Sequence, residues 1–339
     1  MKEELKTLVR EYLDNKALAE QVFVWQSAYL PPVCASILLK AGRSFTKEEL
    51  ENARNLIKDN TGIFSDYRGT AMTVMACVLA AESNPESAMN KSLEVYNELR
   101  KHFSASEYLP FVSMIIGRLS KHYEYIPVFQ RAKAIYDDMK QNHPFLTSKD
   151  DVSNAALLAY STKADAEIGT ELENCYNELK KYFSSSNDVQ ALSQVLTIGE
   201  GSWQDNCARF MRIFKGLGDK GYKYGKDSRL PILGALSVIS VPEEELIQDV
   251  IDICEALKGQ KGYGFFGFTK SDRLMHAVML LSTYYAKQKN DLFVQSTAMT
   301  EAVDAAATVA ELNSIIAILA AQNAAMISTV MVVSASSNH

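Results

Sequence analysis

Two lysine-rich segments carry the residue types in this sequence that are best suited to binding chemistry. Residues 215–229 (KGLGDKGYKYGKDSR) and residues 258–273 (KGQKGYGFFGFTKSDR) each interleave basic, aromatic and glycine residues. Ammonium and guanidinium groups pair with anions, aromatic rings cover an apolar part of a ligand, and glycine lets backbone N–H groups come close. We therefore hypothesise a surface that binds an anionic group. Its candidate residues are Lys220, Tyr222, Lys223, Lys226, Lys261, Tyr263, Phe266, Lys270 and Arg273.

The simpler interpretation of these two segments is a pair of solvated turns, in which the aromatic residues fill space between helices. Against it, like charges placed close together repel, and a purely structural turn gains nothing by keeping them. An anionic ligand would offset that repulsion. At the level of sequence both interpretations stay open.

Other motifs do not assemble into a catalytic or metal site. Residues 216–221 (GLGDKG) have the spelling of a dinucleotide-binding loop, but no strand precedes them as that loop requires. His122 and Glu124 have the H-x-E spacing of zinc deaminases, but no P-C-x-x-C follows. No two histidines lie at ligand spacing, and no G-x-S-x-G elbow exposes a serine nucleophile. We expect no metal, no cofactor and no catalytic residue.

An acidic residue recurs close to each predicted turn. A ring of carboxylates at the mouth of a cavity would be able to do acid–base chemistry. Acids that follow small hydroxyl residues are, however, typical of helix N-caps and first turns, so we favour helix capping. The six acids are Asp66, Glu107, Asp151, Asp188, Asp227 and Asp272.

The elements that position these residues repeat with a period near 40. Positions with the same pattern of neighbours lie 38 to 40 residues apart, as subtraction of their numbers shows, and they are Ile57, Tyr96, Tyr136, Tyr176, Phe214 and Cys254. A period of this length predicts stacked pairs of helices. We expect the tyrosines in this column to be buried, because they share an apolar stripe at helical spacing with their neighbours.

Within each predicted pair the two helices differ in composition. The first has one apolar stripe and should be half exposed, whereas the second is much more apolar, as in residues 70–81 and 230–239, and should be buried. An aromatic residue where the first helix of each pair should end is predicted to fill the space between neighbouring hairpins, as an aromatic plug. These aromatics are Phe64, Phe103, Phe145, Phe183, Tyr222 and Tyr263.

We predict an all-α chain built from six to seven antiparallel helical hairpins, either an open α-solenoid or a closed α/α toroid. Residues 1–289 would form the repeat domain, with residues 1–44 as an N-terminal capping unit. Residues 290–339 would form an Ala-rich, largely uncharged C-terminal helix and tail. We expect this helix to pack on the repeat body, and the alternatives are self-association and contact with a membrane.

Composition limits the classes of partner that the protein could bind and the cellular compartment in which it could reside. A formal net charge of −6 over 339 residues disfavours nucleic acid as a partner, because proteins that bind nucleic acid present an excess of Lys and Arg.

The five cysteines are odd in number, far apart and embedded in apolar runs, which is typical of buried thiols in a reducing compartment. They are Cys34, Cys77, Cys175, Cys207 and Cys254. We infer a cytoplasmic location.

Several turn strings make the chain resemble a known family. They are FSDYRG, HPFLTS, YFSSSNDVQALSQVL, KGYKYG, KGYGFFG and LAAQNAAMI. With these strings the chain resembles a bacterial domain-of-unknown-function family, number 4003 in that series, over residues 5–330. The resemblance implies a bacterial, cytosolic protein and implies no activity and no catalytic residues.

The sequence favours a helical-repeat binding or scaffold protein that holds a peptide or an anionic small molecule. Fold alone does not establish this function. The alternative is an α/α-toroid enzyme that acts on an apolar or phosphorylated small molecule. That alternative needs polar groups that converge in a closed cavity, and the sequence shows no such constellation.

Overall fold

The computed structural model describes the chain except for residues 25–27, 120–124, 162, 200, 265–266 and 296–339. All regular elements of the described residues are α-helices, so the predicted all-α class is confirmed. The helices are α1 (Glu3–Val22), α2 (Leu30–Lys40), α3 (Lys47–Asn60), α4 (Thr70–Ala81), α5 (Pro85–Leu99), α6 (Leu109–Leu119), α7 (Tyr125–Asn142), α8 (Asp151–Leu158), α9 (Asp165–Leu179), α10 (Ser186–Ile198), α11 (Trp203–Asp219), α12 (Leu230–Ser237), α13 (Glu243–Leu257) and α14 (Lys270–Gln295).

Local sequence signals explain where the helices begin. At α3 the Thr46 hydroxyl accepts a hydrogen bond from the Glu49 N–H, and the Glu49 carboxylate accepts one from the Thr46 N–H at 2.7 Å. This reciprocal pair is a capping box, which satisfies two backbone donors that the helix leaves free. At the start of α5 the Asn84 side chain accepts a hydrogen bond from the Ser87 N–H, and at the start of α11 the Ser202 hydroxyl accepts one from the Asp205 N–H.

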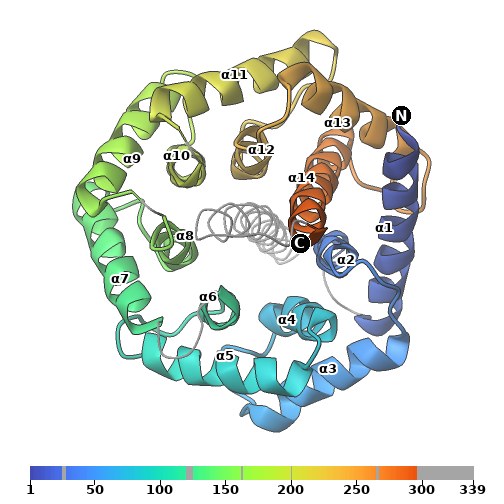
Figure 1. The fold of residues 1–339 in the computed structure, drawn as a ribbon, viewed down its shortest axis with the longest axis vertical. Helices are drawn as coiled ribbons and strands as arrows, with labels where there is room; N and C mark the ends of the chain where they lie inside the picture. The colour runs from blue at the N-terminus through green and yellow to red at the C-terminus, as the bar shows by residue number, and fades with distance from the viewer. Residues whose placement is uncertain (25–27, 120–124, 162, 200, 265–266, 296–339) are drawn as a thin grey trace, which may run out of the picture. The chain divides into compact units, whose positions relative to one another are not determined.

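The described helices belong to two compact units. Unit 2 contains Asp14–Thr170, and within it α3 packs on α4, α5 on α6 and α7 on α8. The apolar helices α2, α4, α6 and α8 also contact one another in that order, as the inner row of blue to green helices in Figure 1 shows.

Unit 1 contains Met1–Leu13 and the described residues from Glu171 to Gln295. Within it α10 contacts α12, α12 contacts α14, and α11 contacts α13. Helix α11 packs on α12 and α13 packs on α14 (Figure 1). Each unit therefore consists of long helices packed against a row of apolar ones.

Burial differs between the two kinds of helix as the sequence predicts. All eight residues of α12 are buried, and so are ten residues of α2. In α3, by contrast, only Leu50, Ala53 and Ile57 are buried. The bounds of α4 and α6 coincide with the apolar segments that the sequence shows at residues 70–81 and 109–119.

The tyrosines of the repeating column are less buried than predicted. Tyr96, Tyr136 and Tyr176 are half-buried. The residue before each of them is the one in the core: Val95, Ile135 and Cys175. Adjacent helix positions point about 100° apart, so only one of the two can face the centre of the interface.

The predicted aromatic plugs are correct at three turns and wrong at two. Phe103, Phe183 and Tyr263 are buried, and Tyr222 is half-buried. Phe64 and Phe145, however, are 95% and 98% exposed. In the turn of Phe64 the buried aromatic is Tyr67, whose hydroxyl bonds the hydroxyls of Ser92 and Ser113. Where two aromatics lie three residues apart, the path of the turn decides which one points inward.

The predicted C-terminal helix falls largely outside the described residues, because α14 is described only as far as Gln295. Its packing, self-association and membrane contact all stay predictions. No helix in the described part of the chain combines the length and the apolar character that crossing a membrane requires.

Candidate functional site

The first lysine-rich segment begins at the end of α11. Gly221 has a φ of 82°, the Tyr222 N–H donates to the Leu217 carbonyl at 2.8 Å, and the Gly221 N–H donates to that of Gly218. This is the glycine-terminated C-cap that left-handed backbone allows. The string GLGDKG is therefore the last turn of a helix and its cap, in agreement with its rejection as a nucleotide loop.

Lys270 connects the two lysine-rich segments. It is the first residue of α14, and its Nζ donates to the Gly221 carbonyl at 3.0 Å. The same ammonium lies 4.5 Å from the centre of the Tyr222 ring. Burial raises the pKa of the Tyr222 hydroxyl, as does its hydrogen bond to Glu255. Lys270 thus brings residues about 50 positions apart together at one place in unit 1.

Four further candidate lysines are exposed: Lys220, Lys223, Lys226 and Lys261. Lys220 Nζ lies 3.9 Å from the exposed carboxylate of Glu244, a weak surface contact. Lys226 Nζ lies 5.9 Å from the centre of the Phe183 ring. These ammonium groups are accessible to solvent and to any anion dissolved in it.

Tyr263 and Arg273 lie in the core, at 2% and 8% exposure, and not on the lysine-rich surface. The Tyr263 hydroxyl lies 2.7 Å from the Tyr12 hydroxyl and 2.9 Å from His276 Nδ1. Burial raises the pKa of the Cys254 thiol, and a hydrogen bond from Arg273 opposes that shift. Phe266 lies outside the described residues. Neither Tyr263 nor Arg273 is placed to touch a ligand at the surface.

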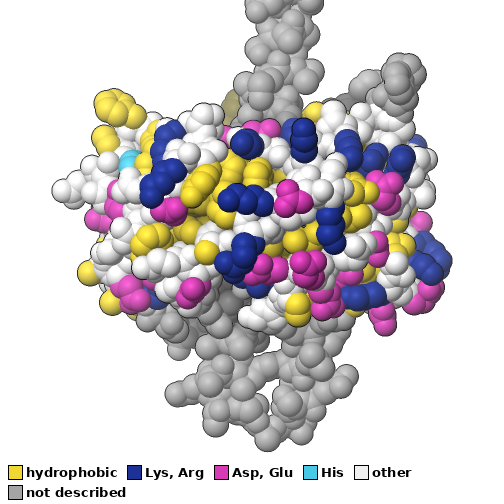
Figure 2. All heavy atoms as spheres, turned by 90° about the horizontal axis from the view of Figure 1, so that it is seen from above, with side chains coloured by type: hydrophobic (Ala, Val, Ile, Leu, Met, Phe, Trp, Pro, Cys, Tyr) yellow, Lys and Arg dark blue, Asp and Glu magenta, His cyan; other side chains and the backbone are white. Residues whose placement is uncertain are grey.

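The lysine-rich surface is a local feature of an acidic protein. On the face of the molecule drawn in Figure 2, basic and acidic side chains are interspersed, with hydrophobic side chains between them. No single block of one sign covers that face. The formal net charge of the whole chain is −6, so any affinity for an anion must come from particular lysines.

Two of the recurring acids, Asp151 and Asp272, bond backbone N–H groups at helix starts, and Asp188 lies in the first turn of α10, as the sequence predicts. The Asp151 carboxylate accepts from the Ser148 N–H at 2.7 Å, and the Asp272 carboxylate accepts from the Thr269 N–H at 3.1 Å. At α10 the Ser185 hydroxyl accepts from the Asp188 N–H. Burial raises the pKa of Asp188, and nearby Asp227 adds to the shift.

Asp66 has a different role, because it joins two turns. Its Oδ2 accepts from the Tyr96 hydroxyl at 2.8 Å and from the Ser106 N–H at 2.9 Å. Burial raises the pKa of neighbouring Glu107, and the charge of Asp66 adds to it. Over the described residues, no three His, Cys, Asp or Glu side chains converge as a metal site would require.

Sequence reasoning missed two arginines that hold loops in place. Arg131 on α7 donates to the carbonyls of Ala159 at 3.1 Å, Ser161 at 2.5 Å and Lys163, and to the carboxylate of Asp165 at 2.7 Å. These partners follow Arg131 by 28, 30, 32 and 34 residues. They form the loop between α8 and α9.

Arg209 on α11 makes the same set of contacts in the other unit. It donates to the carbonyls of Ser237 at 2.6 Å, Ile239 at 2.9 Å and Val241, and it lies 3.4 Å from the carboxylate of Glu243. The separations are again 28, 30, 32 and 34 residues. We call each arginine with its four partners an arginine clamp. The signal that could have found both clamps is that both arginines stand five positions before the repeating column, at Tyr136 and Phe214.

Comparisons with known proteins now place the chain. A family model described as "Protein of unknown function (DUF4003)" matches residues 15–324. The chain is 25% identical over 283 residues to "Uncharacterized protein YeaA" of Bacillus subtilis (strain 168), which covers 80% of this chain and 83% of that protein. No solved structure matches significantly. The chain therefore belongs to the DUF4003 family of proteins of unknown function.

Proposed function

We propose that this protein is a cytoplasmic helical-repeat binding protein whose lysine-rich surface binds an anionic group. The body would be an array of helical hairpins over residues 1–289, as the period near 40 predicts. Five buried, free thiols are in keeping with a reducing compartment. The observation that carries the binding proposal is the contact of Lys270 with Gly221 and Tyr222, which joins the two lysine-rich segments.

The proposed surface consists of Lys220, Lys223, Lys226 and Lys261, with Lys270 and Tyr222 between the two segments. The four lysines and Lys270 are exposed and supply positive charge, and Lys270 also contacts the Gly221 carbonyl and the Tyr222 ring. Tyr263 and Arg273 would support the surface from the core and would not touch the ligand. Phosphate and carboxylate both suit such a set of ammonium groups.

A thermal-shift screen tests this proposal. The probes are ATP, glucose 6-phosphate and an acidic peptide, each measured at low and high salt. An anion at ten times its Kd should raise the free energy of unfolding by about 1.4 kcal/mol. The effect should decrease as salt rises, because the lysines are exposed to screening.

The matched variants separate this surface from charge in general. Replacing Lys220, Lys223, Lys226 and Lys261 by Ser should abolish the stabilisation. Replacing Lys6, Lys47, Lys58 and Lys101 by Ser removes the same charge from exposed positions elsewhere and should leave it intact. If no probe stabilises the wild type more than the first variant, the two segments are ordinary solvated turns.

A further inference from the structure

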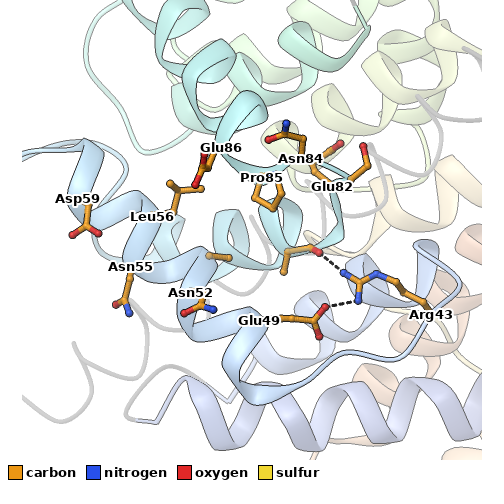
Figure 3. A pocket seen from close by; sticks show the side chains of 13 residues that line it. Arg43, Glu49, Asn52, Asn55, Leu56, Asp59, Glu82, Asn84, Pro85 and Glu86 are labelled. Atoms are coloured by element: carbon orange, nitrogen blue, oxygen red, sulfur yellow. Dashed lines mark hydrogen bonds and ion pairs between the residues drawn. The ribbon is translucent and has the colours of Figure 1, made fainter.

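A polar pocket lies in unit 2 between α3, the end of α4 and the start of α5. Its volume is about 640 Å³. In Figure 3 the side chains of Asn52, Asn55 and Asp59 come from α3, and those of Glu82, Asn84 and Glu86 from the loop and the first turn of α5. None of the residues that line the pocket belongs to the lysine-rich surface.

Several of the residues that line this pocket are at the same positions of the repeat as the residues of the two arginine clamps. Asn52 stands five positions before Ile57 in the repeating column, as Arg131 and Arg209 stand before Tyr136 and Phe214. In the first turns of α3 and α7 burial agrees with this alignment, because Leu50 and Ala53 correspond to Phe129 and Ala132, and all four are buried. At the column itself the two helices differ, since Ile57 is buried and Tyr136 is half-buried. Separations of 28, 30, 32 and 34 residues from Asn52 lead to Ala80, Glu82, Asn84 and Glu86, and all four line the pocket.

The shorter side chain of Asn52 leaves acceptors unused. Arg43 donates to the Ala80 carbonyl at 2.9 Å and to the Glu49 carboxylate at 2.6 Å, so one carbonyl is taken (Figure 3). Among the described residues, no donor bonds the carbonyls of Glu82 and Ser83. In the two clamps the guanidinium donates to the carbonyls 28, 30 and 32 positions after the arginine. Here the carbonyl at 32, that of Asn84, accepts from the Ala88 N–H at 3.1 Å, so the Glu82 carbonyl is the clamp acceptor left without a donor in the described part of the chain.

The pocket also contains two carboxylates that form no ion pair with any described residue. Asp59 and Glu86 line it, both are exposed, and no ion pair within the described part of the chain involves either of them. Asp165 and Glu243, at the start of α9 and α13, pair with the clamp arginines instead. The pocket therefore has the Glu82 carbonyl and the Glu86 carboxylate of a clamp without a guanidinium from α3, while Arg43 takes the Ala80 carbonyl and Arg118 lies 3.5 Å from the Glu82 carboxylate.

We propose that this pocket binds a guanidinium group from outside the chain, such as the side chain of an arginine. A planar fork of five N–H donors reaches several carbonyls and a carboxylate at once, as it does in both clamps. An ammonium group is a compact point charge and matches such spread acceptors less well. The binding site consists of Asn52, the carbonyls of Glu82 and Ser83, and the carboxylates of Glu86 and Asp59.

Ligand-observed NMR with defined probes tests the pocket. N-acetyl-L-arginine amide should bind the full-length protein. The lysine and citrulline counterparts should bind at least about tenfold more weakly, because one lacks the fork and the other lacks the charge. Free L-arginine and acetyl-Gly-Arg-Gly amide distinguish the source of the guanidinium. Tighter binding of the free amino acid indicates a small molecule, and tighter binding of the peptide indicates a protein segment.

The decisive variant is Asn52→Arg, which places the missing arginine on α3. Its guanidinium should fill the pocket, reduce probe affinity at least about tenfold and raise the melting temperature by about 2 to 4 °C. Asn90→Arg adds the same side chain at an exposed position of α5 outside the pocket and should change neither. Glu86→Gln should weaken probe binding severalfold without filling the pocket. The proposal is overturned if Asn52→Arg binds the probe as tightly as the wild type does, or if the lysine probe binds as tightly as the arginine probe.

Discussion

At the scale of single residues, the arginine clamps are the contacts with the clearest chemistry. A loop that follows a helix leaves carbonyl groups without partners, and each buried carbonyl that lacks a partner destabilises the fold. Arg209 satisfies three such carbonyls with one side chain that is 22% exposed. The loop between α12 and α13 is thereby held to α11.

We expect Arg209→Ala to lower the free energy of unfolding by about 2 to 3 kcal/mol, because three carbonyls and Glu243 lose their donor. Arg212 offers a matched control, since it pairs with the same Glu243 but is 58% exposed and bonds no carbonyl of this loop. Arg212→Ala should lower the free energy of unfolding by less than about 1 kcal/mol. Urea unfolding of both variants measures the difference. Equal effects would show that the clamp contributes nothing beyond its ion pair.

At the scale of elements, the turns between paired helices decide which aromatic residue supports the packing. Phe183 is 2% exposed, and its ring lies 5.2 Å from the ring of Phe214 on α11 in an edge-on arrangement. Phe64, which the sequence places in the corresponding position, is 95% exposed. The two residues have the same chemistry and opposite surroundings.

Phe183→Ala should therefore lower the free energy of unfolding by about 3 to 5 kcal/mol, since it opens a cavity between helices. Phe64→Ala should change it by no more than about 0.5 kcal/mol, since it removes only exposed surface. Thermal or chemical unfolding of the pair measures both values. A large effect of Phe64→Ala would mean that this turn packs differently in solution.

At the scale of the whole molecule, the N-terminal segment belongs to a unit that lies far along the chain. Met1–Leu13 is part of unit 1, with the described residues from Glu171 to Gln295. Lys2 Nζ lies 2.7 Å from the Asp249 carboxylate, and the Tyr12 hydroxyl bonds that of Tyr263. Unit 1 is therefore complete only when Met1–Leu13 has packed against residues more than 150 positions later in the chain. Bringing such distant segments together costs loop-closure entropy, which slows folding.

Deletion of residues 1–13 should destabilise unit 1 selectively, because it uncovers α13 and leaves the Tyr263 hydroxyl without Tyr12. Hydrogen exchange should become faster in α13 and α14 than in α4 and α6. Lys2→Ala is the milder control and should have little effect, because Lys2 is 41% exposed. Unchanged exchange in α13 after the deletion would contradict this account of unit 1.

The sequence alone determined the helical class, the course of the apolar helices and the repeating column. Those properties are local, because a helix with a 3.6-residue turn buries whatever its apolar spacing puts on one face. The predicted segment 70–81 therefore coincides with α4, and the predicted segment 230–239 begins with α12, which ends two residues earlier at Ser237. The half-burial of Tyr96, Tyr136 and Tyr176 could not be predicted, since neighbouring positions compete for the same interface and packing between helices decides which one enters it.

Only the tertiary structure decided which candidate residues are available for binding. Lys223 and Arg273 look alike in the sequence, yet the first is exposed and the second is packed beside Cys254. The arginine clamps and the pocket at Asn52 likewise depend on backbone carbonyls. The place of Arg131 and Arg209 before the repeating column marks the two arginines in the sequence, but it does not show which carbonyls they bind. A contact between a side chain and a carbonyl 28 to 34 residues away is set by how a loop returns over a helix, and that path exists only once the helices have packed.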